Sequence, residues 1–181
     1  MLRNDHTAID IRKAGKNDVT LLADLSRRTF YDTYHMFNTP ENMDIYISGH
    51  FNELQIAVEL TNPVVSIFIA TYTDTIVGYI KLDLVNYSSI PNGNGMEVSR
   101  FYVDKDFQNL GAGKLLMNKA VEFARENNCN YLWLGVWQKN LRAVEIYEHL
   151  GFAIKGTTTF LLGDDEQEDF VMVKKLKDEE E

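Results

Sequence analysis

A glycine-bearing loop followed by a helix is the segment of this chain whose residues could bind an anion. The loop runs from Gln108 through Gly111 to Gly113, and apolar residues recur at helical spacing from Lys114 onwards. The first N–H groups of a helix have no partner within it, and they lie at the positive end of the helix dipole. The spacing therefore predicts an anion-binding site, and a tight turn packed by small residues is the alternative interpretation.

Two common phosphate-binding loops do not fit this segment. The nucleoside-triphosphate loop requires a glycine where Gln108 stands and a hydroxyl where Leu115 stands. The dinucleotide loop requires a third glycine where Leu116 stands. The pattern that remains is Gln-x-x-Gly-x-Gly, in which the glutamine adds a hydrogen-bond donor and the glycines let a ligand approach the backbone.

A second group of residues with chemical potential follows later in the chain. Asn140, Ala143 and Tyr147 are three and four residues apart, so one side of a helix carries all of them. Trp137 ends an apolar segment before them, and Gly151 ends the helix after them. Each residue alone also has a structural interpretation: a helix cap for the asparagine, packing for the alanine and a half-buried ring for the tyrosine.

Together and in this order, the two patterns resemble those of the Gcn5-related N-acetyltransferases, the GNAT family, which bind acetyl-coenzyme A. The resemblance covers most of the chain and is strongest over residues 96–152. It implies that the loop binds the pyrophosphate, that N–H groups of the preceding strand hold the thioester carbonyl, and that the later helix contacts the pantetheine. The residues that it assigns to acetyl-coenzyme A are Phe101, Tyr102, Val103, Gln108, Asn109, Leu110, Gly111, Ala112, Gly113, Lys114, Asn140, Ala143 and Tyr147.

Two residues are candidates for catalysis under this resemblance. An alkyl amine with a pKa of about 10.4 is protonated at neutral pH, so a carboxylate must take up its proton before it can attack. Glu97 lies on the expected central strand where the family often places this base; a cross-strand pair with a lysine or a solvent-facing position is the alternative. Ser99 stands where relatives often have a second acid. Tyr147 would protonate or hydrogen-bond the departing sulfur.

Shorter segments outside the coenzyme-binding core narrow the resemblance. Residues 29–34, 48–51, 134–137 and 163–167 are similar to those of the bacterial spermidine/spermine N-acetyltransferases of the PaiA type, which implies a polyamine acceptor. A protein N-terminus, a lysine side chain or another small amine is the alternative acceptor, and a coenzyme A-binding regulatory module without turnover is the alternative function. By family geometry the acceptor side is bordered by carboxylates and aromatic rings, which suit a linear polycation: Tyr31, Asp32, Tyr34, His35, Glu97, Asp164 and Asp165.

The composition limits the classes of protein that this chain can represent. Its 181 residues, 45% of them hydrophobic, suit one domain over residues 1–181. The net charge of −9 arises from acids at 164–169 and from an acidic tail, and residues 176–181 are expected to be disordered. The chain has no basic stripe of the kind that would indicate nucleic-acid binding. It also has no apolar run that approaches the roughly 20 residues needed to span a bilayer.

Cysteine and histidine usage sets further expectations. One cysteine, Cys129, and an N-terminus without an apolar signal segment indicate a cytoplasmic protein. Since Cys129 begins a strand with no histidine beside it, direct attack in a ternary complex is expected rather than an acetylated cysteine. No metal is expected, and either a monomer or a homodimer fits. The histidines, which lack metal-ligand spacing, are His6, His35, His50 and His149.

The elements that position these residues follow from the apolar spacing. Strands are expected at 7–14, 64–72, 75–86, 96–103, 131–137, 152–162 and 170–175, with 164–169 as the turn of the last hairpin. Helices are expected at 17–33, 39–47, 52–62, 114–127 and 140–150. The order predicts a single α/β (α+β) domain with a mixed sheet of about seven strands flanked by helices. The unit spanning 96–137 must be a right-handed crossover, so its two strands are parallel, and by the resemblance they splay apart at the cofactor site.

Overall fold

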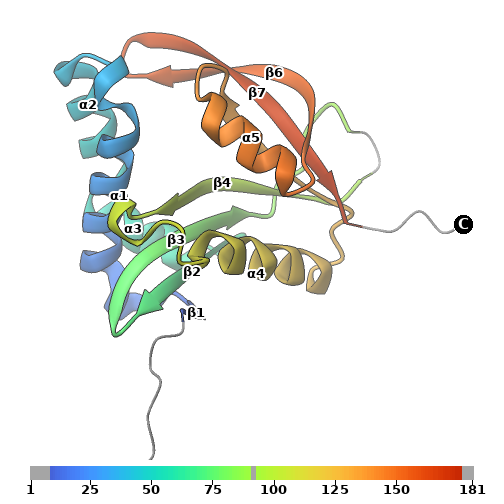
Figure 1. Ribbon diagram of the computed structural model, residues 1–181, viewed down its shortest axis with the longest axis horizontal. Helices are drawn as coiled ribbons and strands as arrows, with labels where there is room; N and C mark the ends of the chain where they lie inside the picture. The colour runs from blue at the N-terminus through green and yellow to red at the C-terminus, as the bar shows by residue number, and fades with distance from the viewer. Residues whose placement is uncertain (1–8, 91–92, 177–181) are drawn as a thin grey trace, which may run out of the picture.

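One mixed sheet organises the part of the chain that the computed structural model describes, residues 9–90 and 93–176 (Figure 1). Its strand order is β1-β2-β3-β4-β5-β7-β6. The strands are β1 Asp10–Lys13, β2 Val65–Tyr72, β3 Thr75–Asp83, β4 Gly95–Val103, β5 Tyr131–Trp137, β6 Ala153–Leu162 and β7 Asp165–Lys175. The α-helices are α1 Val19–Tyr34, α2 Pro40–His50, α3 Glu53–Thr61, α4 Ala112–Glu126 and α5 Leu141–His149. Short 3₁₀ turns lie at Lys16–Asp18, His35–Phe37 and Lys105–Phe107.

The β4–β5 pair is parallel, and the other neighbouring strands of the described sheet are antiparallel. The two parallel strands pair only where Gly95–Glu97 lies beside Tyr131–Trp133. Beyond these residues the described parts of β4 and β5 form no further pairs, so the sheet opens between its two halves. The α/β fold with a mixed sheet and a splayed parallel pair is therefore confirmed.

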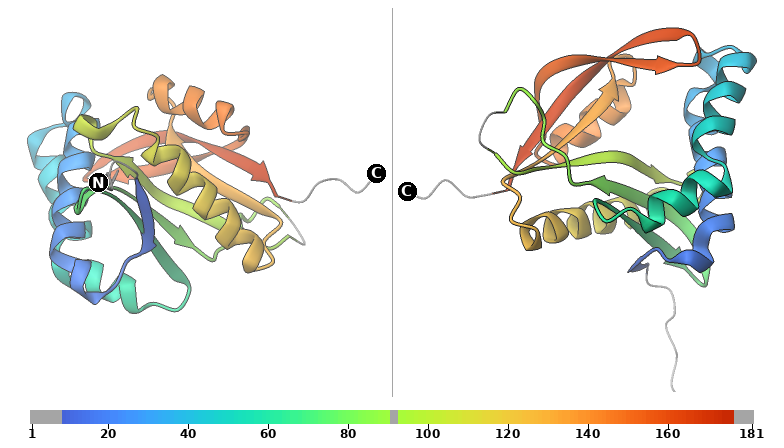
Figure 2. Two further views of the ribbon diagram at one scale, coloured as in Figure 1. Left: turned by 60° about the horizontal axis from the view of Figure 1, so that its bottom comes forward. Right: turned by 180° about the vertical axis from the view of Figure 1, so that it is seen from behind.

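Helices cover the two faces of the sheet unequally. Tyr79 and Ile80 are neighbours in β3, so they point to opposite faces, and they belong to different apolar clusters. The Ile80 cluster includes Leu116 and Met117 of α4, and the Tyr79 cluster includes Leu22 of α1. Figure 2 shows α1, α2 and α3 gathered together on one side of the molecule. On this face of the sheet, the part formed by β5 to β7 is consequently less covered by helices than the part formed by the other strands.

The apolar residues that recur at helical spacing in α1 and α4 face the core. Leu22, Leu25 and Phe30 of α1 are at most 2% exposed. Helix α3 differs, because Leu54 and Val58 are exposed while Ile56 and Glu59 are buried. The apolar residues Leu54 and Val58 therefore do not mark the buried side of this helix.

The acidic segment at 164–169 is the clearest boundary error. The hairpin turn is only Gly163 and Asp164, and β7 begins at Asp165. Within β7, Glu166 and Glu168 are exposed while the residues between and after them are buried, which is the alternation of a strand. The acidic residues therefore led to the prediction of a turn where the chain forms a strand. The expected strand residues 7–8 and the acidic tail from 177 lie outside the described residues.

Across residues 9–90 and 93–176, none of the helices combines the length and the apolar character that crossing a membrane would require.

Candidate functional site

A β-bulge in β4 determines which side chains face which cavity. Glu97 pairs with Asp83 of β3 and Arg100 pairs with Lys81, so Ser99 is an extra residue on the β4 side. A bulge shifts the alternation of side chains along the strand. Arg100 consequently reaches Glu59 of α3, beside the α1 face of the sheet, while the next residue, Phe101, packs in the core beside α4 and α5.

A cleft of about 540 Å³ lies where β4 and β5 diverge, between the start of α4 and the start of α5. Ten of the thirteen residues assigned to acetyl-coenzyme A line it. These are Phe101, Tyr102, Val103, Gln108, Asn109, Ala112, Gly113, Asn140, Ala143 and Tyr147. The other three, Leu110, Gly111 and Lys114, belong to the same loop and helix start but do not line the cleft. The fold thus brings together two motifs that are some thirty residues apart in the sequence.

The start of α4 has the geometry of an anion-binding site. Gly111 is its N-cap, with a φ of 89° that L-residues rarely adopt, and no side chain caps the helix. The first intrahelical hydrogen bond is donated by the Leu115 N–H to the Gly111 carbonyl oxygen at 3.1 Å. The N–H groups of the first turn are therefore free of intrahelical partners, and Ala112 and Gly113 of that turn line the cleft.

Gln108 is tied to two other elements of the cleft. Its Nε2 donates to Val103 O at 3.3 Å, and its Oε1 accepts from Arg142 Nη2 at 3.1 Å. One N–H of the amide remains for a ligand. Arg142 also lines the cleft and places a positive charge beside the glycine loop. Sequence reasoning missed Arg142, because only the fold brings it to a glutamine 34 residues away.

Asn140 and Tyr147 enter the cleft from α5. Asn140 caps this helix by accepting the Ala143 N–H at 3.2 Å, which leaves its amide nitrogen for another partner. The Tyr147 ring packs between Phe101, at 6.2 Å between centroids, and Phe152, at 5.8 Å. Burial raises the pKa of Tyr147 above its usual value, so the phenol keeps its proton at neutral pH.

A second cavity of about 300 Å³ adjoins this cleft on the α1 face of the sheet. Tyr34, Ser99 and Arg100 line both cavities, and Gly135 of β5 lines both from the opposite side of the opening. Because Tyr34 and Glu97, which the sequence predicts on the acceptor side, line the second cavity, we call it the acceptor chamber. Its wall is largely aromatic and is formed by Phe30, Tyr34, Tyr46, Phe51, Tyr102, Trp133, Trp137 and Phe160. Sequence reasoning assigned only Tyr34 and Tyr102 among them to the site, because the rings come from α1, α2, β4, β5 and β6 and from Phe51 after α2.

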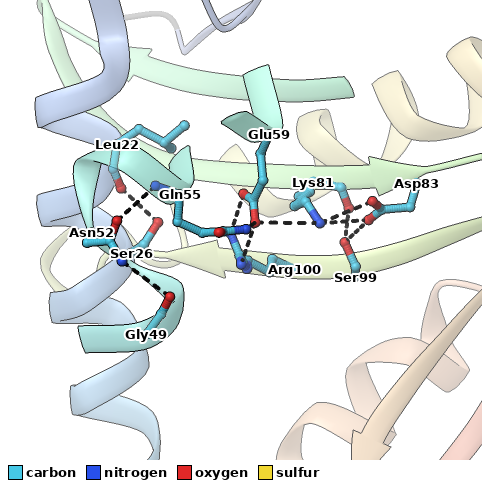
Figure 3. A network of polar contacts seen from close by, with 10 residues as sticks. All are labelled: Leu22, Ser26, Gly49, Asn52, Gln55, Glu59, Lys81, Asp83, Ser99 and Arg100. Atoms are coloured by element: carbon cyan, nitrogen blue, oxygen red, sulfur yellow. Dashed lines mark hydrogen bonds and ion pairs between the residues drawn. The ribbon is translucent and has the colours of Figure 1, made fainter. Parts of the chain in front are cut away.

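Glu97 lines the acceptor chamber. Burial, and then the charge of Asp83 opposite it, raises the pKa of the Glu97 carboxyl; Lys81 acts in the other direction. Lys81 Nζ bonds Asp83 at 3.0 Å, as Figure 3 shows, so the cross-strand lysine pair considered for Glu97 is not formed. Its assignment as the base remains a prediction.

The positive charge at the opening is neutralised within the protein. Arg100 makes a two-point ion pair with Glu59 of α3, at 2.8 and 3.0 Å (Figure 3). Its guanidinium also lies 4.8 Å from the centre of the Phe51 ring. Because Glu59 and Arg100 offset each other, the carboxyl groups of the acceptor chamber dominate its electrostatic character.

Most residues expected on the acceptor side do not line this chamber. The rings of Tyr31 and His35 stack on each other with 4.7 Å between their centroids, and both lie outside the two cavities. Asp32 lines the first cleft, paired with Lys105 at 3.1 Å. The other two acids, Asp164 in the β6–β7 turn and Asp165 at the start of β7, lie outside both cavities.

Cys129 is buried and lines neither cavity, and burial raises the pKa of its thiol. Within residues 9–90 and 93–176, no group of three or more histidine, cysteine or acidic side chains is placed to hold a metal ion.

Comparison with known proteins identifies the class of protein that this fold and site define. The sequence profile of the acetyltransferase (GNAT) family matches residues 22–152. An uncharacterized N-acetyltransferase of Lactobacillus delbrueckii subsp. lactis is 34% identical over 171 residues, which are 94% of this chain and 99% of the relative. The chain therefore belongs to the GNAT family of N-acetyltransferases, and the family predicted from the two motifs is confirmed.

Two further proteins are similar to this chain, one in its fold and one over part of its sequence. The crystal structure of the PaiA N-acetyltransferase from Thermoplasma acidophilum in complex with coenzyme A superposes with a TM-score of 0.79. It is 23% identical and covers 93% of this chain and 99% of its own, which shows a shared fold. The spermine/spermidine N(1)-acetyltransferase of Bacillus subtilis strain 168 is 27% identical over 107 residues, 58% of this chain and 66% of the relative.

Proposed function

We propose that this N-acetyltransferase transfers an acetyl group from acetyl-coenzyme A to a primary amine of a polyamine such as spermidine or spermine. The observation that carries the proposal is the meeting of two unlike cavities where β4 and β5 diverge. One is bordered by a helix N-terminus and an arginine, and the other by carboxyl groups and aromatic rings. The spermine/spermidine acetyltransferase among the relatives supports the choice of acceptor.

The residues of the first cleft fit acetyl-coenzyme A. Free N–H groups at the start of α4, with Arg142 beside them, suit the diphosphate. The amide nitrogen of Asn140 suits the pantetheine arm, and the unpaired part of β4 suits the thioester carbonyl. Acetyl-coenzyme A supplies the activated thioester, and the protein positions it by these contacts.

The chamber residues then act on the acceptor by direct attack. Glu97 takes one proton from the ammonium group of the acceptor, and its raised pKa makes it a better proton acceptor than an ordinary glutamate. The neutral nitrogen forms a bond to the thioester carbon as the carbon–sulfur bond breaks, and the second proton that the nitrogen then loses balances the one that the sulfur takes up. The tyrosine hydroxyl of Tyr147 donates a proton or a hydrogen bond to the sulfur, which leaves as a thiol. Cys129 takes no part, because it lies outside both cavities.

The acceptor chamber favours a cation with an aliphatic body. Carboxyl groups attract the ammonium, and the faces of aromatic rings attract it as well. The same rings pack against methylene groups, so the chain between nitrogen atoms gains from burial. A neutral or anionic acceptor would bring no charge to offset the acids of this chamber.

A panel of acceptors tests the proposal. Free thiol release from acetyl-coenzyme A should be fastest with spermidine or spermine, and slower with a lysine peptide, a peptide with a free N-terminus or small monoamines. Faster thiol release with either peptide would indicate that the acceptor is a protein rather than a polyamine. Absence of release with every amine, together with tight coenzyme binding in calorimetry, would indicate a regulatory module instead.

A further inference from the structure

Asp169 has a buried carboxyl group for which the described part of the fold provides no partner. Its side chain is 8% exposed, and its Oδ1 atom has no hydrogen-bond partner among the described residues. It lies on β7 opposite Trp137 of β5 and lines the acceptor chamber. An unpaired carboxylate at such a site costs free energy of folding, because it loses water without gaining donors. The group therefore calls for a ligand that donates to it.

The position of Asp169 places it beside the opening between the two cavities. A Cβ atom added to Gly135 would lie 3.3 Å from Asp169 Oδ2, so the carboxyl group lies directly against this glycine. Gly135 lines both cavities. A side chain at position 135 would stand between the opening and the carboxyl group, and the glycine keeps this approach open.

Glu97 and Asp169 face the same chamber from opposite sides of the opening. Glu97 is in register with Trp133 of β5, and Asp169 is in register with Trp137. These two positions are about 13 Å apart along the strand, and Asp169 leans back from its end toward Gly135. One nitrogen atom cannot contact both carboxyl groups over this span, whereas two nitrogen atoms joined by a short aliphatic chain can.

Aromatic rings fill the space around the two acids. Tyr34, Tyr46 and Trp137 line the chamber beside Asp169, and Arg100 is held by Glu59. Burial raises the pKa values of Tyr34 and Tyr46, and the nearby Asp169 carboxylate adds to this rise. Among the residues that the structure describes, the charged groups that line the chamber thus leave Asp169 without an internal cation.

We infer that Asp169 binds a second ammonium group of the acceptor, which stays charged, while Glu97 faces the nitrogen that reacts. This inference rests on the proposed amine acetylation and adds to it a two-point requirement. The chamber prefers an acceptor with two cationic nitrogen atoms over a monoamine of the same length, and Asp169 is the source of that preference.

Substituting Asp169→Asn tests the inference, because it keeps the shape of the side chain and removes its charge. The probes are 1,4-diaminobutane and 1-aminobutane. In the wild-type protein the diamine should have the lower KM. In D169N its KM should rise by about ten- to a hundredfold, the range for a lost hydrogen bond to a charged group. The KM of the monoamine and the kcat for both amines should change by less than about threefold, since the reacting nitrogen keeps its contacts.

Glu168→Gln is the matched control, because it removes one charge from the adjacent, exposed position of β7. It should leave the KM values for both amines unchanged. An equal rise in KM for both amines in D169N, or a lower kcat at constant KM, would overturn the inference. An unchanged preference for the diamine in D169N would overturn it as well.

Calorimetric titration of the two amines separates this inference from the proposed function. Tighter binding of 1,4-diaminobutane by the wild type, lost in D169N and retained in E168Q, would support the role of Asp169 even if no amine released thiol. Rapid thiol release with a diamine preference that D169N retains would support the acetyltransferase and refute the role of Asp169.

Discussion

Burial gives the main candidate residues their chemical properties. Tyr147 packs between two aromatic rings, and Glu97 lies on a strand opposite another acid. Burial raises the pKa values of both side chains, which keeps the phenol protonated and makes the carboxylate a stronger base. The acid and the base that we propose therefore lie on the two sides of one opening.

The phenol of Tyr147 can be tested by removing its hydroxyl alone. Tyr147→Phe keeps the ring that contacts Phe101, so the dissociation constant for coenzyme A should change by less than about threefold. The kcat should fall on the order of a hundredfold, because the leaving sulfur loses its proton donor. Calorimetry and thiol-release kinetics measure the two quantities. Equal losses of affinity and turnover would show that the hydroxyl only positions the coenzyme.

Asp169 also predicts a dependence of stability on pH. Burial raises its pKa from 3.8 to about 6, so the folded state takes up a proton between these values while the unfolded state does not. The contribution of this group to stability therefore falls as the pH rises through that window. Asp169→Asn should raise the free energy of unfolding at neutral pH by about 2–3 kcal/mol, and the gain should shrink toward pH 4.

Urea unfolding of wild type and D169N at several pH values measures this difference. Glu168→Gln again serves as the control, since the exposed Glu168 should give little difference at any pH. Destabilisation by D169N at neutral pH would show that Asp169 has an internal partner. It would also remove the physical reason for assigning it a ligand.

At the level of elements, the loop before α4 carries the coenzyme-binding part of the account. Gly111 lies at a φ of 89°, and an added Cβ would meet no atom within 4 Å. Gly111→Ala should therefore cost about 1–2 kcal/mol through backbone strain alone, or shift the helix start and weaken coenzyme A binding. Calorimetry with coenzyme A and thermal unfolding measure both effects.

Gly49 offers a matched glycine substitution. It lies inside α2, an added Cβ would also meet no atom within 4 Å, and its φ is not in the left-handed region. Gly49→Ala should stabilise the protein by about 0.5–1 kcal/mol and leave coenzyme binding unchanged. Equal behaviour of G49A and G111A would contradict the role given to the loop geometry.

The elements themselves were largely predictable because their apolar spacing is regular. Helix α4 is an example, since Leu116, Met117 and Ala120 recur on one face and are buried. The bulge at Ser99 could not be predicted, because it depends on pairing with β3 rather than on local sequence. The acids of β7 were predicted to form a turn, because a run of acidic residues is typical of turns. The alternation of buried and exposed side chains that identifies them as a strand is evident only once β7 is paired in the sheet.

The candidate site was predictable only where a motif is continuous in the sequence. Gln108, Gly113 and Tyr147 were found because they belong to two short patterns, and the structure places them in one cleft. Asp169 and Arg142 were missed, since each gains its position from elements distant in the sequence. Their residue types alone do not distinguish them from surface charges.

At the scale of the whole molecule, the divergence of β4 and β5 joins the two ligand sites. The β1–β4 half carries Glu97, α4 and the glycine loop, and the β5–β7 half carries Asp169 and, through α5, Tyr147 (Figure 1). A coenzyme bound between the halves would place its thioester at the opening that both cavities share. Catalysis would therefore require both halves of the sheet to hold their positions.

The most direct test measures both products of one reaction, the free thiol and monoacetylated spermidine. With acetyl-coenzyme A, spermidine and the wild-type protein, we expect the two to accumulate in equal amounts, and Y147F to slow both together. Thiol release without acetylated spermidine or any other acetylated amine, or no product of either kind across the amine panel, would contradict acetyl transfer at the opening between β4 and β5.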